Sequence, residues 1–238
     1  LSEFDTAIEF FRSAMNDFRD CKDSFCELTG KLWIALTYLR AKQIAKYEGI
    51  IGQVLEAVKD KEYHCLLERT TLLGIRDVNM LAPLLLDAGK TFKDHRFLQG
   101  LVAERGLADL DYHPGYTLRI QGLGHVRFWR GKEEIEGKEW QREKAQELFL
   151  LLFINRGKHL PKETIYYSLW PDDSEETAAR NFKVSLNALK KTLEPDRHAQ
   201  QDSFFIVRSR SNYGFNERAS YVFDAQEFEM LLAEGDRQ

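Results

Sequence analysis

The sequence predicts a mainly α-helical protein with a small β part, arranged as two successive regions. Apolar residues recur every three or four positions from Phe4 to about Leu107, where glycine and proline are scarce. Apolar and polar residues then alternate between residues 116 and 135, which is typical of short strands. Helical spacing returns at residue 142 and recurs up to residue 193. We therefore expect an all-helical region followed by a mixed α and β region.

The composition is that of packed globular domains. The chain has 238 residues, of which 43% are apolar and 12% aromatic, so it has room for two modest domains. Its net charge of -4 argues against a chain that binds polyanions over its whole surface. From Thr177 to Arg218, however, eight Lys or Arg residues stand against four Asp or Glu residues. Any contact with a polyanion is therefore expected in this segment.

The cysteines and the apolar runs bear on the compartment. Cys21, Cys26 and Cys65 are odd in number and lack CxxC or CxxH spacing, so we expect reduced thiols in a cytoplasmic protein. The longest apolar run, 148–154, is shorter than the roughly 18 residues that span a bilayer, and no secretion signal opens the chain. No membrane contact is expected. Because the chain begins at Leu1 and a new helix starts at 225–234, we expect a part of a larger protein.

Three helices of four to five turns are predicted first, with breaks near residues 20–23, 41–42 and 60–61. Their apolar stripes are Phe4, Ile8, Phe11 and Met15; then Leu32, Ile34, Ala35, Tyr38 and Leu39; then Ile44, Tyr47, Ile51, Val54, Leu55 and Val58. Shorter helices are predicted over 62–73, 77–88, which contains Pro83, and 93–104. Trp33, Ala35, Leu36 and Tyr38 are similar to the first helix of a tetratricopeptide-like (TPR-like) repeat. Residues 1–107 are thus interpreted as a TPR-like array, with an ordinary helical bundle as the alternative.

The second region begins after a linker at 108–115, which contains His113-Pro114-Gly115. Three short antiparallel strands are predicted between Tyr116 and Ile135. Helices follow over 142–155, 162–170 and 174–193, and Asp173 with Glu176 is expected to form a reciprocal N-terminal cap on the third. A hairpin with a basic tip is predicted over 204–217. A sheet, three helices and a hairpin are the order of a winged helix-turn-helix, so the second region is predicted to be an α+β winged helix-turn-helix with an N-terminal antiparallel sheet.

The helix at 174–193 carries two opposed stripes. Phe182, Leu186, Leu189 and Leu193 lie within roughly 40° of one another on a helical projection. The other side combines hydrogen-bonding side chains with small or apolar ones, namely Arg180, Asn187 and Lys191 with Thr177, Val184 and Ala188. This combination is typical of a helix that reads DNA, because the small residues allow close approach to a thymine methyl group. A solvated amphipathic helix is the alternative.

Six blocks of the second region form a characteristic set, namely the strand pair at 120–130, Trp140-x-Arg142-x-Lys144-Ala145-x-x-Leu148, residues 156–163, Leu169-Trp170-Pro171, Arg180-Asn181-x-x-Val184-x-Leu186-x-x-Leu189-Lys190-Lys191, and Tyr213-Gly214-Phe215. Through these blocks, residues 116–232 closely resemble the winged helix-turn-helix of the Streptomyces antibiotic regulatory protein (SARP) group, related to the OmpR/PhoB-type effector domain. Residues 224–232 look like the start of the family's helical activation domain, here truncated within 224–238. The array before them looks like that of MalT-type activators, although this chain has no Walker motif.

The resemblance implies a sequence-specific, DNA-binding transcriptional regulator, with activation as the expected outcome. The helix at 174–193 would enter the major groove and the hairpin at 204–217, the wing, would contact the backbone or minor groove. The expected DNA contacts are Arg180, Asn181, Lys183, Val184, Asn187 and Lys191 on the helix; Arg208, Arg210, Asn212 and Tyr213 on the wing; and Lys162 on the preceding helix. An exposed hairpin tip without a ligand is the alternative for the wing. The family often has Arg where Ala188, Lys190 and Lys191 stand, and Lys lacks the bidentate fork of Arg.

The expected partners are double-stranded DNA, a peptide or domain for the array, a second copy of the chain on DNA, and RNA polymerase at the loop 171–176. Helix capping explains the acidic residues of that loop equally well. The competing interpretation is an interaction scaffold in which the winged domain binds protein instead of DNA. An enzyme is not expected, because the six histidines are scattered without metal-ligand spacing and no nucleophile elbow or phosphate loop occurs. No cofactor and no metal are expected either.

Overall fold

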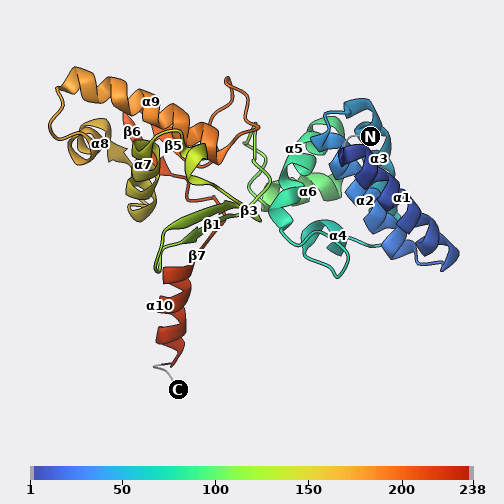
Figure 1. The fold of residues 1–238 in the computed structure, drawn as a ribbon. Helices are drawn as coiled ribbons and strands as arrows, with labels where there is room; N and C mark the ends of the chain where they lie inside the picture. Colours follow the sequence, from blue (N-terminus) through green and yellow to red (C-terminus); the bar gives the residue numbers. More distant parts are fainter. Residues whose placement is uncertain (1–2, 236–238) are drawn as a thin grey trace. The chain divides into compact units, whose positions relative to one another are not determined.

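The computed structural model describes residues 3–235. The chain is mostly helical with a small mixed β part, and it divides into two compact units at the bond between Gly115 and Tyr116 (Figure 1). Each unit has its own core and is described by itself. No helix of the described residues is both long and apolar enough to cross a membrane.

Between residue 3 and Gly115, the regular elements of the first unit are all helices. Its elements are α1 (Glu3–Asp20), α2 (Ser24–Arg40), α3 (Ile44–Asp60), α4 (Cys65–Glu68), the 3-10 helix η1 (Val78–Leu81), α5 (Ala82–Thr91) and α6 (Arg96–Glu104). α1 packs on α2, and α2 on α3. The turns between these long helices each contain a residue with positive φ, Lys22 and Lys42, and Glu62 follows α3 in the same way. A left-handed residue ends a helix by turning the chain back, so the predicted breaks are turns of one kind.

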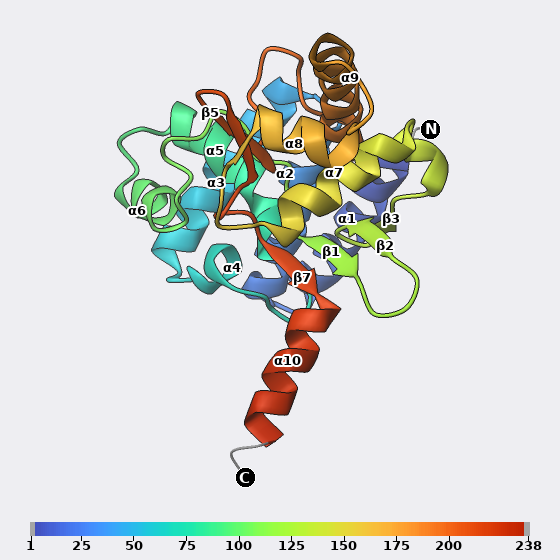
Figure 2. The ribbon, with the colours of Figure 1, turned by 90° about the vertical axis from the view of Figure 1, so that its left-hand side faces the viewer.

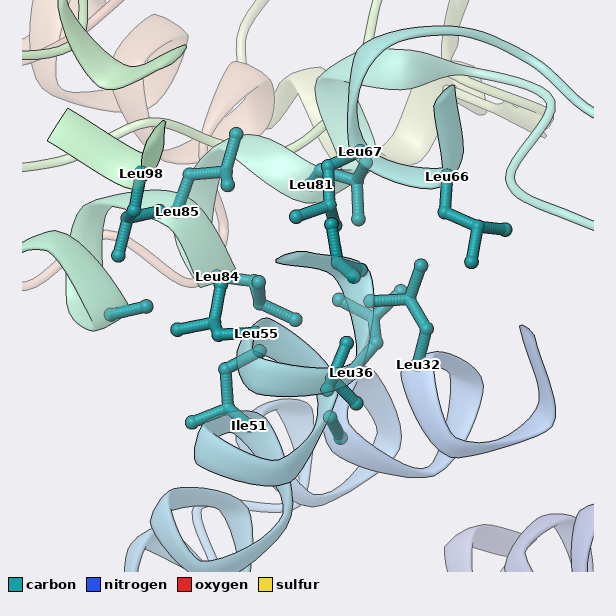
Figure 3. Close-up of a cluster of buried hydrophobic side chains, with 14 of the residues drawn as sticks. Leu32, Leu36, Ile51, Leu55, Leu66, Leu67, Leu81, Leu84, Leu85 and Leu98 are labelled. Atoms are coloured by element: carbon teal, nitrogen blue, oxygen red, sulfur yellow. The ribbon is translucent and has the colours of Figure 1, made fainter. Parts of the chain in front are cut away.

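Leucine and isoleucine side chains from α2 to α6 form the core of the first unit (Figure 3). Leu32 and Leu36 of α2 and Ile51 and Leu55 of α3 meet the leucines of the later helices, which are Leu66, Leu67, Leu81, Leu84, Leu85 and Leu98. The core also holds the hydroxyl group of Tyr47, which donates a hydrogen bond of 3.1 Å to the Leu84 carbonyl. α2 approaches α1 closely at Gly30, where a Cβ atom would lie 2.5 Å from Met15 Cγ.

Several sequence predictions for this unit were wrong. The helix predicted over 62–73 is reduced to the single turn of α4, and residues 69–77 form an irregular segment. Pro83 does not lie in the middle of a helix as predicted. A 3-10 turn precedes it and α5 starts at Ala82, which puts the proline in the first turn of α5, where its missing N–H is tolerated. Phe4 and Ile44 are 42% and 43% exposed, so they stand outside the core stripes assigned to them.

From Tyr116 to residue 235, the second unit contains two small sheets and four helices longer than one turn. Its strands are β1 (Leu118–Gln121), β2 (Arg127–Arg130), β3 (Glu133–Glu134), β4 (Leu160–Pro161), β5 (Ile206–Ser209), β6 (Asn212–Phe215) and β7 (Tyr221–Phe223). Its helices are η2 (Gly137–Trp140), α7 (Glu143–Ile154), α8 (Lys162–Leu169), α9 (Glu175–Leu193) and α10 (Asp224–Gly235). The helices predicted over 142–155, 162–170 and 174–193 are thereby confirmed with shifts of one residue or less at their ends.

The first sheet has the strand order β3-β2-β1-β7, and the prediction that it is antiparallel was wrong in one respect. β1 and β2 pair antiparallel, as do β2 and β3, but β7 joins β1 in parallel, with Leu118 opposite Tyr221. β7 arrives from a distant part of the sequence, so no local pattern announces it. The second sheet has the order β4-β6-β5 and contains the expected hairpin.

An aromatic core joins the two sheets to α7. Phe149 and Phe153 of α7 meet Phe128 of β2, Phe215 of β6 and Tyr221 of β7, with ring centroids 5.2 to 6.2 Å apart. α9 packs across α7 and α8 (Figure 2). α10 follows β7 directly, and none of its described residues is buried. Its start is held by Asp224, whose carboxylate accepts hydrogen bonds from the backbone N–H groups of Gly122 and Leu123.

Candidate nucleic-acid interface

The start of α9 is fixed by Ser174, not by Asp173 as predicted. The Ser174 hydroxyl oxygen accepts a hydrogen bond of 3.3 Å from the Thr177 backbone N–H, which is the contact of an N-cap residue. The Asp173 carboxylate instead accepts a hydrogen bond of 2.8 Å from the Asn181 side-chain amide, two helical turns further on. Asn181 is half-buried, so its amide braces the loop before α9, and the prediction that it contacts DNA on the flank of the helix is not supported by its position.

One side of α9 is buried over its whole length. Phe182, Leu186, Leu189 and Leu193 are buried as predicted, and the Phe182 ring packs on Tyr166 of α8 and Tyr213 of β6. Ala178, Ser185 and Thr192 are buried as well. Ala188, predicted to face outward, is only 7% exposed; it lies one turn before Thr192, on the side of α9 that contacts η2. The exposed strip is therefore narrower than the sequence suggested.

The exposed strip of α9, which we call the α9 ridge, consists of Arg180, Lys183, Val184, Asn187 and Lys191. All five lie within about 60° of Arg180 on a helix of 100° per residue. Within the described chain, the four polar side chains of the ridge make no hydrogen bond and no ion pair. Three cationic groups and one amide are therefore presented to solvent along three turns.

Acidic residues limit the ridge at its N-terminal end. Asp172, Asp173, Glu175 and Glu176 are exposed, and Glu176 lies one turn before Arg180 on nearly the same side of the helix. Carboxylates there stabilise the helix start by opposing its dipole, but they repel phosphate groups. A polyanion would therefore be held by the ridge from Arg180 toward the C-terminal end.

The β5–β6 hairpin lies next to the buried face of α9. Arg208 and Arg210 are exposed at its tip, and Arg210 adopts a positive φ of 57° in the turn. The Arg208 guanidinium donates a hydrogen bond of 2.7 Å to the Arg210 carbonyl and lies 5.8 Å from the centroid of the Tyr213 ring. The hairpin thus holds one of its two arginines in a defined position.

Tyr213 and Asn212 lie deeper than predicted. Tyr213 is 7% exposed, and its ring meets Phe182 edge-on with centroids 5.0 Å apart, so it joins the hairpin to α9 and is not a surface contact. Asn212 is half-buried and pairs in the sheet with Ser209 and Pro161. Because Pro161 pairs with Asn212, the next residue, Lys162, lies beside the hairpin strand at the start of α8, where it is half-buried. No described residue forms a hydrogen bond or ion pair with the side chain of Lys162.

The C-terminal end of α9 is held by buried charged groups that the sequence analysis did not single out. The Glu194 carboxylate accepts hydrogen bonds of 2.8 Å from both the Ser203 hydroxyl and the Phe205 backbone N–H, and its second oxygen lies 3.0 Å from Arg197 Nε. Burial raises the pKa of Glu194, against the opposing effect of these donors. Because Phe205 immediately precedes β5, this network, which we call the Glu194 clamp, fixes the hairpin relative to α9.

Arg130 of β2 makes a second connection to the same end of the helix. Its guanidinium donates 2.8 Å to the Thr192 carbonyl and 2.6 Å to the Glu139 carboxylate. The Tyr116 hydroxyl also donates to the Leu193 carbonyl. A carbonyl at the end of a helix lacks a partner within the helix, so these donors satisfy groups that would otherwise be unpaired. No spacing pattern in the sequence predicts the Glu194 clamp or the contacts of Arg130 and Tyr116, because the partners come from separate parts of the sequence.

Basic side chains surround the Glu194 clamp, namely those of Lys190, Arg197 and Arg208. Lys190 is half-buried, and burial lowers the pKa of its ammonium group, an effect to which the nearby charges of Arg197 and Arg208 add. Together with the α9 ridge and the hairpin, these side chains account for the cationic surplus seen in the sequence. Among residues 3–235, no group of three or more His, Cys, Asp or Glu residues could hold a metal ion.

No family model, no curated protein and no solved structure matches this chain. The function is therefore argued from the geometry of the second unit.

Proposed function

We propose that residues 116–223 form a winged helix-turn-helix that binds double-stranded DNA, and that the chain is part of a transcriptional regulator. The observation that carries this proposal is the α9 ridge, whose charged and amide side chains are exposed and lack partners within the described chain. The order of sheet, α7, α8, α9 and the β5–β6 hairpin supports it, since this is the order of elements expected for a winged helix-turn-helix.

In the proposed complex, α9 lies in the major groove and the hairpin acts as the wing on the neighbouring backbone. Lys183 and Lys191 approach phosphates on the two sides of the groove, while Arg208 and Arg210 contact the backbone next to it. The exposed acids of the loop 171–176 lie beyond the N-terminal end of the ridge, outside the proposed phosphate contacts. Since Ser174 supplies the capping hydrogen bond, the carboxylates of Asp172, Glu175 and Glu176 are not required as the cap and are available to a basic protein surface, such as that of RNA polymerase.

The proposal is tested by measuring the binding of the full chain to a labelled duplex by fluorescence anisotropy as salt is varied. Five phosphates neutralised by Lys162, Lys183, Lys191, Arg208 and Arg210 predict a fall of log affinity against log salt with a slope of roughly -4 to -5. The variant R180A/N187A/K191A is expected to lose DNA binding while keeping the circular dichroism of the parent.

A matched control is K132A/R142A, which removes two exposed cations elsewhere in the second unit and is to be compared with R180A/K191A. Only the pair on the ridge should weaken binding strongly. A flat salt response, or equal losses in the two double variants, would contradict the proposal. If the folded triple variant binds DNA as the parent does, the ridge is not the DNA contact and the interaction scaffold is favoured.

A further inference from the structure

Two side chains of the α9 ridge, those of Arg180 and Asn187, lie nearly in line along the helix, and their separation matches the spacing of base pairs. Arg180 and Asn187 are seven residues apart, so they lie within about 20° of one another and are separated by roughly 10 Å along the helix axis. Val184 lies between them and is 38% exposed. Base pairs follow one another every 3.4 Å along a DNA strand, so this separation covers about three base-pair steps.

Each of the three side chains has a different preferred partner on a base edge. The Arg guanidinium forms two hydrogen bonds with O6 and N7 of guanine, and the Asn amide forms two with N6 and N7 of adenine. A branched apolar side chain contacts the 5-methyl group of thymine. No described residue forms a hydrogen bond or ion pair with Arg180 or Asn187, so both can offer their full set of donors and acceptors.

We propose that α9 reads a DNA site in which a guanine and an adenine lie about three base pairs apart, with a thymine methyl group between them. Arg180 recognises the guanine, Asn187 the adenine and Val184 the thymine. This inference rests on the proposed function, and it assigns the residues that determine sequence preference within it.

The remaining exposed residues of the helix set the limits of this site. Lys183 lies about 60° to one side of Arg180, and Lys191 lies one turn beyond Asn187, so both reach the backbone more readily than the base edges. Glu176 lies one turn before Arg180, where its carboxylate disfavours a further close approach to phosphate. The reading segment thus begins at Arg180 and ends at Asn187.

The experiment selects bound duplexes from a random pool with the full chain and then measures the affinity of each variant for the selected site and for single-base changes in it. The parent is expected to prefer guanine and adenine at two positions about three base pairs apart, by about tenfold or more at each position. N187A should lose the preference for adenine and keep that for guanine. R180K should lose the preference for guanine and keep that for adenine, because the charge remains but the bidentate fork is lost.

K191A provides the contrasting variant. It should weaken binding to all duplexes alike and reduce the salt slope by about one, without changing the preference at either base. Preferences that remain in R180K and N187A, or two affected positions that are adjacent or more than five base pairs apart, would overturn the assignment while DNA binding itself stands. If the parent binds no duplex at low salt, the proposed function fails instead.

Discussion

We expect one substitution in the Glu194 clamp, Glu194→Ala, to lower the free energy of unfolding of the second unit strongly. The change leaves two buried donors, the Ser203 hydroxyl and the Phe205 backbone N–H, without the oxygen that both contact at 2.8 Å. It also leaves Arg197, whose side chain is 15% exposed, without its carboxylate. Breaking a buried pair by removing one partner costs about 3–5 kcal/mol, of which the unsatisfied donors account for the larger part. We expect the second unit to lose about 4 kcal/mol of its free energy of unfolding.

Urea unfolding of the full chain, followed by tryptophan fluorescence, measures this loss. Trp129, Trp140 and Trp170 belong to the second unit and Trp33 to the first, so most of the signal reports on the unit that contains the clamp. For a unit of this size the same loss lowers the melting temperature by roughly 10–20 °C. Glu217→Ala, at an exposed position of the same unit, should change the stability by less than about 0.5 kcal/mol.

Glu194→Gln separates the hydrogen bonds from the charge. The amide oxygen can still accept from Ser203 and Phe205, and the charge that burial disfavours is absent, so we expect Gln to cost less than half as much as Ala. The pKa of the Glu194 carboxyl is raised in the folded chain above its ordinary value of 4.5. The folded chain therefore protonates Glu194 more readily than the unfolded chain does. The parent should therefore lose stability relative to the Gln variant as the pH rises through that raised pKa. An Ala variant within 1 kcal/mol of the parent, or a Gln variant as costly as Ala, would refute this account of the clamp.

Two further predictions concern His113 and Ser174. Burial lowers the pKa of His113 to about 4, so the unfolded chain takes up its proton first as the pH falls, and the first unit should lose up to about 3 kcal/mol between pH 6.5 and pH 4. Urea titrations at both pH values should show this loss for the exposed-site variant His125→Asn but not for His113→Asn; equal pH dependence in the two would contradict it. Ser174→Ala removes the cap of α9 and should cost about 1 kcal/mol, measured by thermal unfolding, whereas Asp172→Ala should cost clearly less.

The sequence predicted α9 well because its apolar residues recur at helical spacing over many turns. In a helix of 19 residues this spacing is repeated over about five turns, so a single atypical residue does not obscure the pattern. The same reasoning overestimated the exposed face of α9, because Ala188 is small enough to be tolerated on either side of a helix, and only the packing of elements from distant parts of the sequence decides its burial. The cap was misassigned by one residue, since Asp173 and Ser174 are both good N-cap residues and the hydrogen bond to Asn181 decides between them.

Tyr213 could have been placed correctly from the sequence. Its strand alternates, and it therefore shares a face with Phe215, whose apolar ring belongs in a core. The Glu194 clamp could not have been predicted in the same way, because its carboxylate is satisfied by groups nine and eleven residues further along an irregular loop. The helix predicted at 62–73 failed for another reason: Thr70 and Thr71 are poor helix formers, and Gly74 follows them closely.

The parallel pairing of β7 with β1 has a consequence for the order in which the second unit is assembled. Leu118 meets Tyr221 across this pair, so nearly the entire unit must leave the ribosome before the sheet gains its fourth strand. Until then one edge of β1 has open N–H and C=O groups, which can pair with another nascent chain. Closing so long a loop is slow compared with forming α9, and translation that pauses before residue 221 should favour aggregation.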